Sequence, residues 1–157
     1  MNAPPEECAR EVLDTVPQVM RFIRCQVRRH PAEGLALPRF RTLNFVSRVK
    51  DPSLSEAAEH LGVALPAMSR LVNDLVDNGW LDRRMVATNR RRIALELTVA
   101  GRAKLETVRA AIRRRLAENL ASLSAADRQA VRQGMRALRE AFEAPPGGVE
   151  KVRRSAP

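Results

Sequence analysis

Residues 53–80 read SLSEAAEHLGVALPAMSRLVNDLVDNGW, and this stretch decides the fold. It contains two apolar sets with helical spacing, namely Leu54, Ala57, Ala58 and Leu61, then Met68, Leu71, Val72 and Leu75. Ser53 and Glu56 have the spacing of a capping box, and Gly62 can adopt the positive φ that ends a helix. Pro66 suits the first turn of the next helix. The pattern therefore predicts a helix-turn-helix.

A short basic hairpin is expected directly after this motif. Gly79 can end the second helix, and Trp80 then begins extended structure. Residues 81–86 and 93–97 are β-compatible, and residues 87–90 lie between them as the loop. Together these elements predict a winged helix-turn-helix at about residues 36–98, within a mainly α fold that has a small β wing.

Long helices are expected on both sides of the winged motif. An apolar stripe runs through residues 10–30, where Pro17 should end, start or kink a helix, and another helix should span 38–50. Its inward residues would be Phe40, Leu43, Val46 and Val49. Two further helices are expected over 99–144, the first capped by Thr98 and the second by Ser124. Together they carry more apolar surface than the winged motif can cover. We therefore predict dimerisation helices at 10–30 and 99–144, a flexible arm at 1–9 and a disordered basic tail at 145–157.

The net charge limits the classes of binding partner to consider. The 157 residues include 28 Lys and Arg against 18 Asp and Glu, a net charge of +10, which favours a polyanion such as nucleic acid or an anionic membrane. No stretch approaches the ~20 apolar residues of a membrane span, and residues 1–10 lack a signal-peptide layout, so we expect a cytoplasmic protein without a membrane partner. Aromatic residues make up only 3%, which argues against base stacking as the main binding mode.

Two groups of side chains are candidates for contacts with double-stranded DNA. The outward face of the second motif helix carries Ser69, Arg70 and Asn73, which suit the major groove. The wing contributes five arginines in a ten-residue window without an acid, namely Arg83, Arg84, Arg90, Arg91 and Arg92. The alternative for the wing is a solvated surface in an Arg-rich chain. The alternative for Arg70 is a surface ion pair with Asp74, which could coexist with a DNA contact.

Over about residues 11–142 the sequence resembles the MarR family of winged-helix transcription regulators. The segments that carry the resemblance are LALPRF at 35–40, EAAEHLGV at 56–63, SRLV at 69–72, DNGWL at 77–81, the Arg90-Arg91 pair and LTVAG at 97–101. The resemblance implies a homodimer with intertwined first and last helices that reads a pseudo-palindrome. It also implies, for many members, a small-molecule pocket between the dimer helices and the DNA-binding lobe, and hence a possible inducer.

Two departures from the family pattern bear on specificity. The reading helix of such proteins usually starts with Ser, Thr and Lys, whereas residues 64–67 here are Ala, Leu, Pro and Ala. In the wing, Asn89 stands where the family commonly has an Asp two residues before its groove-inserting arginine. The alignment favours Arg91 as that arginine, although a neutral amide cannot hold a guanidinium by charge.

Other reactive residues receive simpler interpretations. His60 has no second ligand at a suitable spacing, so we expect a surface histidine and no metal site. Cys25 lies among Arg24, Arg28 and Arg29, which would favour a reactive thiolate, and some members of the family sense peroxides through a first-helix cysteine. That branch of the family relies on tyrosines, which are absent here, so we expect a buried and inert thiol. No catalytic constellation or cofactor motif is present.

The sequence thus predicts a regulator rather than an enzyme. We expect a ligand-responsive repressor that binds a pseudo-palindromic operator as a homodimer. The alternative is an architectural protein that binds nucleic acid without sequence preference, which the apolar start of the reading helix favours.

Overall fold

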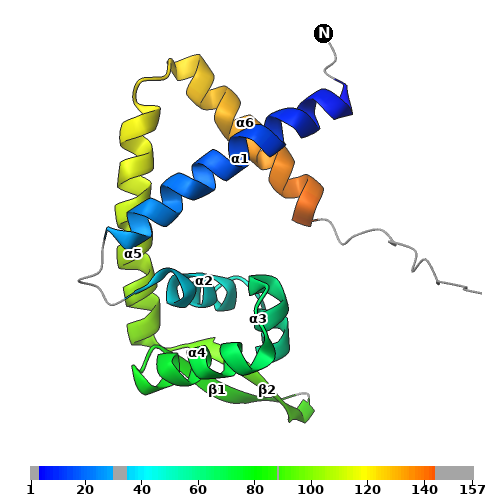
Figure 1. Ribbon diagram of the computed structural model, residues 1–157, viewed down its shortest axis with the longest axis vertical. Coiled ribbons are helices and arrows are strands. Elements are labelled where there is room, and N and C mark those ends of the chain that lie inside the picture. Colours follow the sequence, from blue (N-terminus) through cyan, green and yellow to red (C-terminus); the bar gives the residue numbers. More distant parts are fainter. Residues whose placement is uncertain (1–3, 30–34, 88, 144–157) are drawn as a thin grey trace, which may run out of the picture. The chain divides into compact units, whose positions relative to one another are not determined.

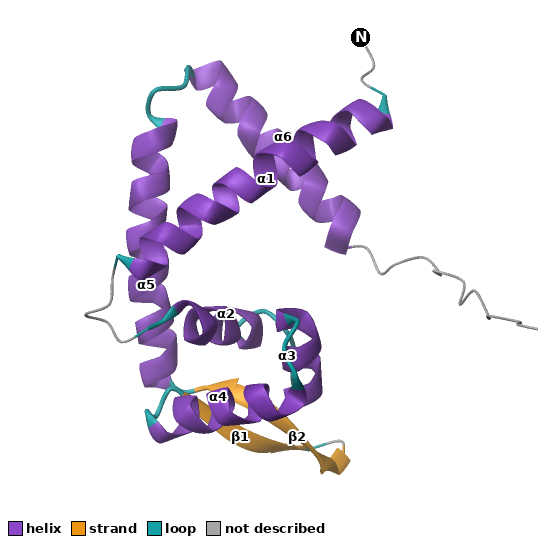
Figure 2. Ribbon diagram, viewed as in Figure 1, coloured by secondary structure: helices purple, strands orange, loops and turns teal. Residues whose placement is uncertain are grey.

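The computed structural model describes residues 4–29, 35–87 and 89–143. Within them the chain forms six helices and one two-stranded antiparallel sheet (Figure 1, Figure 2). The elements are α1 (Pro5–Arg28), α2 (Leu37–Val46), α3 (Leu54–Leu61), α4 (Leu65–Asp77), β1 (Leu81–Val86), β2 (Asn89–Leu97), α5 (Val99–Leu120) and α6 (Ala125–Glu143). This order confirms the mainly α fold with a β wing. The chain divides into a unit that ends at Arg115 and a second unit that starts at Leu116.

The helix-turn-helix forms as its sequence pattern predicts. Both halves of the capping box are present: the Glu56 amide donates to Ser53 Oγ at 3.2 Å, and the Ser53 amide donates to Glu56 Oε2 at 2.7 Å. Gly62 has φ 69°, a left-handed conformation that ends α3 and turns the chain toward α4. Most members of both apolar sets are buried, namely Ala57, Ala58, Leu61, Met68, Val72 and Leu75, whereas Leu54 and Leu71 are partly buried.

The hairpin pairs β1 with β2 in an antiparallel register that sets Leu81 opposite Leu97 and Met85 opposite Ile93. An irregularity between Met85 and Val86 brings Val86 opposite Asn89. For this reason β2 starts at Asn89 and includes residues that the sequence pattern assigned to the loop. The Leu95 amide also donates to the Pro52 carbonyl at 2.8 Å, which ties the hairpin to the segment before α3.

Helix α2 is shorter than expected. It ends at Val46 rather than near residue 50, and the Ser47 side chain donates to the Asn44 carbonyl at 2.7 Å in the last turn. Because residues 47–50 no longer follow the helix, Val49 is 38% exposed, which corrects its predicted inward orientation. The other expected core residues of this helix, Phe40, Leu43 and Val46, are buried.

Helix α1 begins earlier than expected, at Pro5, so residues 5–9 are helical rather than a loose arm. Proline suits the first turn, and Glu6 and Glu7 stabilise the positive end of the helix dipole. Pro17 lies inside the helix and does not end it. Gln26 and Val27 are buried near the end of α1, whereas Leu13 remains 73% exposed and begins an uncovered apolar stripe on the same helix.

The start of α5 is closely fitted to the end of the α4 segment. Thr98 Oγ1 accepts from the Gly101 amide at 2.9 Å, which confirms the predicted cap, and donates to the Gly79 carbonyl at 2.6 Å. A Cβ at Gly101 would lie 1.9 Å from the Trp80 carbonyl oxygen. Only glycine therefore permits this approach. Further along α5, Leu105 and Val108 are buried in the core.

The second unit contains α6, whose start has the predicted capping arrangement. The Asp127 amide donates to Ser124 Oγ at 3.1 Å. Val131, Met135 and Phe142 are 42%, 57% and 81% exposed, so the predicted apolar side of this helix is uncovered. The basic tail predicted at 145–157 lies outside the described residues. Among the residues that are described, no helix is long and apolar enough to span a membrane.

Candidate nucleic-acid interface

The outward face of α4 is held in place by the apolar side of the same helix. Met68 and Val72 are fully buried, whereas Arg70 and Asn73 are exposed and Ser69 is partly buried. Arg70 has no hydrogen bond or ion pair with any described residue. The predicted alternative of a pair with Asp74 is not formed. Asp74 instead pairs with Arg39, which competes with Arg70 for the same carboxylate.

Asp74 is occupied by an arginine from another helix. Arg39 of α2 donates from Nε to Asp74 Oδ2 and from Nη2 to Asp74 Oδ1, both at 2.7 Å. Two parallel, charge-assisted hydrogen bonds of this kind are stronger than hydrogen bonds between neutral groups and fix the geometry of the pair. The pair connects α2 to α4 and occupies both carboxylate oxygens of Asp74.

Among the described side chains, a hydrogen bond between two candidate residues joins the wing to α4. Arg83 Nη2 on β1 donates to Asn73 Oδ1 on α4 at 2.5 Å. A guanidinium has donors only, so the amide oxygen of Asn73 must face Arg83 and its NH₂ group points elsewhere. The structure therefore brings Asn73 and Arg83 together on one surface and fixes the orientation of the amide.

Two other wing arginines are held by carboxylates. Arg84 donates to Asp51 Oδ1 at 2.5 Å and from Nε to Glu96 Oε2 at 2.9 Å. These hydrogen bonds, that to Asp51 above all, raise the pKa of Arg84 above its ordinary value. The backbone of Asp51 has φ 49°, a left-handed conformation that Asp adopts more readily than most residues.

Arg92 makes the second such contact. Its Nη2 donates to Glu56 Oε2 at 3.1 Å and to the Asp51 carbonyl at 3.1 Å. Hydrogen bonds from Ser53 are the main cause of the lowered pKa of Glu56, and Arg92 adds to that effect. Arg84 and Arg92 thus fasten the hairpin to the segment that starts α3, a role that the sequence did not predict.

The remaining two wing candidates are Arg90 and Arg91, which belong to β2. Their side chains lie outside the described part of the structure. Their contact with the minor groove stays a prediction.

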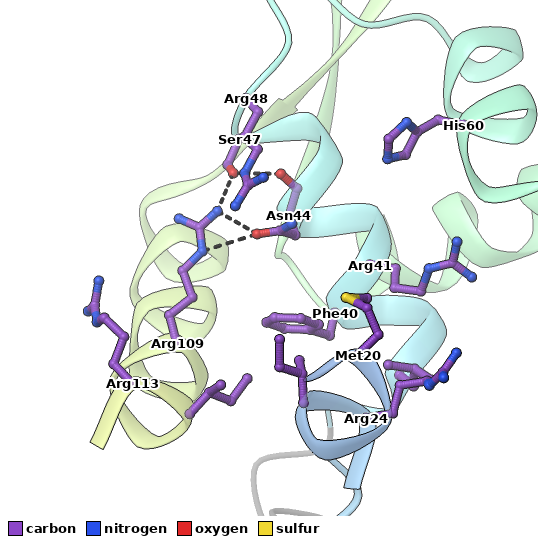
Figure 3. A pocket seen from close by; sticks show the side chains of 13 residues that line it. Met20, Arg24, Phe40, Arg41, Asn44, Ser47, Arg48, His60, Arg109 and Arg113 are labelled. Carbon is purple, nitrogen blue, oxygen red and sulfur yellow. Dashed lines mark hydrogen bonds between the residues drawn. The ribbon is translucent and has the colours of Figure 1, made fainter. Parts of the chain in front are cut away.

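A pocket of about 860 Å³ lies in the first unit, at α1, α2, α3 and α5 (Figure 3). Its apolar wall consists of Met20, Ile23, Leu37, Phe40 and Ile112. Its basic residues are Arg24, Arg41, Arg48, Arg109 and Arg113, together with His60. Asn44 and Ser47 complete the lining, which includes no carboxylate. The pocket therefore suits a ligand with an apolar body and negative charge.

One of these arginines is firmly positioned. Arg109 Nη2 donates to Asn44 Oδ1 at 2.6 Å and to Ser47 Oγ at 2.7 Å (Figure 3). Its Nη1 donates to Glu106 Oε1 at 2.7 Å. Its hydrogen bond is also the main cause of the lowered pKa of Glu106. Since Arg109 belongs to α5 and both Asn44 and Ser47 to the end of α2, these bonds tie α5 to α2 beside the pocket.

The residues considered for metal or redox chemistry have simple surroundings. The exposed ring of His60 stacks on Phe45 with centroids 4.6 Å apart, in accord with a surface histidine. Within the described ranges, no group of three or more His, Cys, Asp or Glu could hold a metal ion. Cys25 is exposed, which corrects the prediction of a buried thiol. The helical register explains the error, because the next two residues, Gln26 and Val27, are the buried ones.

Comparisons with known proteins agree with this architecture. Residues 33–92 match the model of the MarR family. Among solved structures, RV1404 from Mycobacterium tuberculosis is 24% identical, covers 94% of this chain and 100% of its own, and gives a TM-score of 0.70. A MarR family protein from Bacillus stearothermophilus is 19% identical, covers 90% and 99%, and gives 0.72. At these identities both establish the fold.

A third solved structure is closer in sequence. The MarR family protein RV2887 of M. tuberculosis, in complex with salicylic acid, is 27% identical, covers 87% of this chain and 97% of its own, and gives a TM-score of 0.61. No curated protein matches the sequence.

Proposed function

We propose that this chain, whose residues 33–92 match the model of the MarR family, is a homodimeric transcriptional repressor that binds a pseudo-palindromic operator and is released by a small ligand. The observation that carries the proposal is the surface formed by α4 and the wing. Arg70 is available on the face of α4 that the core does not use, and the Arg83–Asn73 hydrogen bond joins that face to β1. A helix in the major groove beside a basic hairpin is how such a surface would contact DNA.

Dimerisation is supported by uncovered apolar surface on each of the two terminal helices. On α1, Leu13, Val16 and Val19 are exposed, and on α6, Met135 and Phe142 are exposed. Monomeric proteins rarely leave contiguous apolar patches beyond a few hundred Å² uncovered. A second copy of the chain would cover both stripes. Light scattering at micromolar concentration should then give twice the chain mass of 17.5 kDa, and a stable monomer would remove the two-half-site model.

Random-sequence selection tests the repressor proposal directly. Near physiological ionic strength it should return a pseudo-palindrome whose half-site centres lie about 10 bp apart, since a two-fold dimer places its reading helices one helical turn apart. Low salt would mask specificity, because phosphate contacts then dominate binding. Selection that enriches no motif would overturn the proposal and favour the architectural alternative.

The ligand is proposed to be a small organic acid with an aromatic or other apolar body. Support comes from the pocket, whose lining combines an apolar wall with five arginines and no carboxylate. Arg109 and Arg113 pair with Glu106 outside the lining, whereas Arg24, Arg41 and Arg48 have no carboxylate partner among the described residues. Support also comes from RV2887, whose solved complex contains salicylic acid. Salicylate should raise the Tm of the protein and release the selected operator, whereas salicylamide, which lacks the carboxylate, should do neither at equal concentration. Equal effects of the two compounds would contradict the role of the arginines.

A further inference from the structure

The first turn of α4 is apolar and exposed, which is unusual for a helix proposed to enter a DNA groove. Leu65, the first residue of α4, is 47% exposed, and Pro66 after it is also exposed. Val63, just before the N-cap, is 40% exposed. The N-cap is Ala64, whose side chain makes no capping hydrogen bond. This turn therefore has no side-chain group that could bond a phosphate or the polar edge of a base.

The core does not require these side chains. The buried side of α4 consists of Met68, Val72 and Leu75, all with 0% exposure. Leu65 precedes Ser69 by four residues, and Pro66 precedes Arg70 by four, so the apolar turn lies directly before the polar candidates along the same side of the helix. If α4 enters the major groove with Arg70, Leu65 enters with it.

The major groove contains one apolar group that distinguishes bases, the 5-methyl group of thymine. We propose that the exposed apolar first turn of α4, centred on Leu65, reads thymine methyl groups in the operator. The inference rests on the proposed function, since it names what that same interface recognises. In this proposal the apolar turn contributes to DNA specificity, although it lacks the Ser, Thr and Lys side chains that usually begin the reading helix in the family.

DNA suits this turn better than a protein partner does. Two large exposed side chains are too few for the apolar centre of a stable protein interface, which buries about 800 Å² on each partner. The same surface also carries the uncompensated guanidinium of Arg70 and the Arg83–Asn73 pair, within a chain of net charge +10. A polyanion with apolar groups between its polar edges matches this combination.

The experiment uses the operator obtained by random-sequence selection and the full-length protein. Each thymine is replaced in turn by deoxyuridine, which keeps every hydrogen-bonding group and lacks only the methyl. One replacement in each half-site should weaken binding about fourfold per half-site, as expected for one methyl group removed from an apolar contact. Deoxyuridine at other thymines should leave affinity unchanged.

Protein variants then locate the contact. In Leu65→Ala the affinity ratio between the thymine and deoxyuridine sites should fall to about one, and Leu65→Gln, which retains length and helix propensity, should do the same. Val99→Ala is the matched control, because Val99 is an exposed apolar residue in the first turn of another helix. It should keep the wild-type ratio. Thermal melting confirms that each variant is folded.

The outcomes separate the two proposals. A specific operator with no deoxyuridine-sensitive position would overturn the thymine inference and leave the repressor proposal intact. A deoxyuridine effect that persists in both Leu65 variants would show that another residue reads the methyl, and would also overturn it. Failure to select any operator would overturn the repressor proposal itself, and the inference with it.

Discussion

The outward face of α4 and the wing both present arginines, but they differ in how those arginines are engaged. Arg70 on α4 has no partner among the described residues, whereas Arg84 and Arg92 on the wing are each bound to carboxylates. An arginine that already has a carboxylate partner must give it up before it can bind a phosphate, so its net gain from DNA is small. The number of arginines in a segment is therefore a poor measure of the charge available for binding.

The comparison also assigns different tasks to the two regions. On α4 the guanidinium of Arg70 has no partner among the described residues and can meet DNA, and the buried apolar side of the same helix holds the helix in place. On the wing, Arg84 and Arg92 bond to Asp51 and Glu56, and these contacts hold the hairpin itself in place. We expect substitutions on α4 to change which DNA is bound, and substitutions at the paired wing arginines to change how firmly the hairpin is held.

The largest effect should come from Gly101→Ala, which disturbs the junction beneath both regions. The new Cβ would meet the Trp80 carbonyl oxygen, a backbone atom that cannot rotate away. We expect a loss of about 3 kcal/mol in the free energy of unfolding, measured by urea denaturation. Gly134→Ala in α6 is the control, because its Cβ would meet no described atom within 4 Å, and it should stabilise the helix by up to about 1 kcal/mol. Equal effects of both would contradict the role of the junction.

Arg70→Ala tests the α4 side of the comparison. An available guanidinium that contacts a base edge should contribute ~1–3 kcal/mol on the selected operator and much less on random DNA. Titration of both duplexes at physiological ionic strength measures the difference. If the variant weakened both duplexes equally, Arg70 would be a phosphate contact and α4 would not be the source of specificity.

Arg91→Ala tests the predicted minor-groove contact of the wing. It should weaken the operator and random DNA more evenly and lower the salt slope of binding by about one unit. Arg91→Lys should recover only part of the affinity, because an ammonium loses more hydration on entering a narrow groove. Arg90 variants are measured in parallel. Full recovery by lysine would indicate a plain phosphate contact instead.

Arg84→Ala should have a smaller effect on DNA and a different signature. Since Arg84 already bonds Asp51 and Glu96, its removal should leave the salt slope unchanged while it loosens the hairpin. Amide hydrogen exchange in β1 and β2 should become faster. A fall in the salt slope as large as that of the Arg91 variant would break the distinction between paired and available arginines.

The smallest effect concerns pH. Contacts with Ser53 and Arg92 lower the pKa of Glu56 below 4.5, so its contribution to stability is present above that value and is lost as the pH falls through the lowered pKa. Because Glu56 is largely exposed, the difference in Tm between pH 6 and pH 3 should shrink only slightly in Glu56→Gln, by about 1–2 °C. An unchanged difference would show that Glu56 has the same pKa in the folded and unfolded chain.

Local patterns explain why much of the fold was predictable. The capping box at Ser53, the positive φ at Gly62 and the apolar spacing from Met68 to Leu75 are decided within a few residues, and all appear as expected. The same holds for the Thr98 cap. The early start of α1 and the outward turn of Val49 were missed, because helix ends depend on weak preferences that tertiary contacts override.

The site was less predictable because its decisive contacts are distant in sequence. Asp51 and Arg84 are 33 residues apart, and Arg39 and Asp74 are 35 apart, so no window around either residue reveals the pair. Glu96 offered a signal, since the antiparallel register places it diagonally across from Arg84. The exposure of Cys25 and the five arginines of the pocket likewise required the three-dimensional arrangement.

The close approach of Gly101 to Trp80 also means that α5 contacts two separate parts of the first unit. Near the start of α5, Gly101 lies so close to the Trp80 carbonyl that no larger residue fits. About two turns later, Arg109 donates a hydrogen bond to Asn44 at the end of α2, beside the pocket. Both points belong to one continuous helix, about 12 Å apart along its axis. A shift of α5 as a rigid element at Arg109 would therefore also shift its contact with the Trp80 carbonyl, where only glycine fits. Glycine at position 101 thus allows one helix to contact both the segment that leads into the wing and the residues beside the pocket.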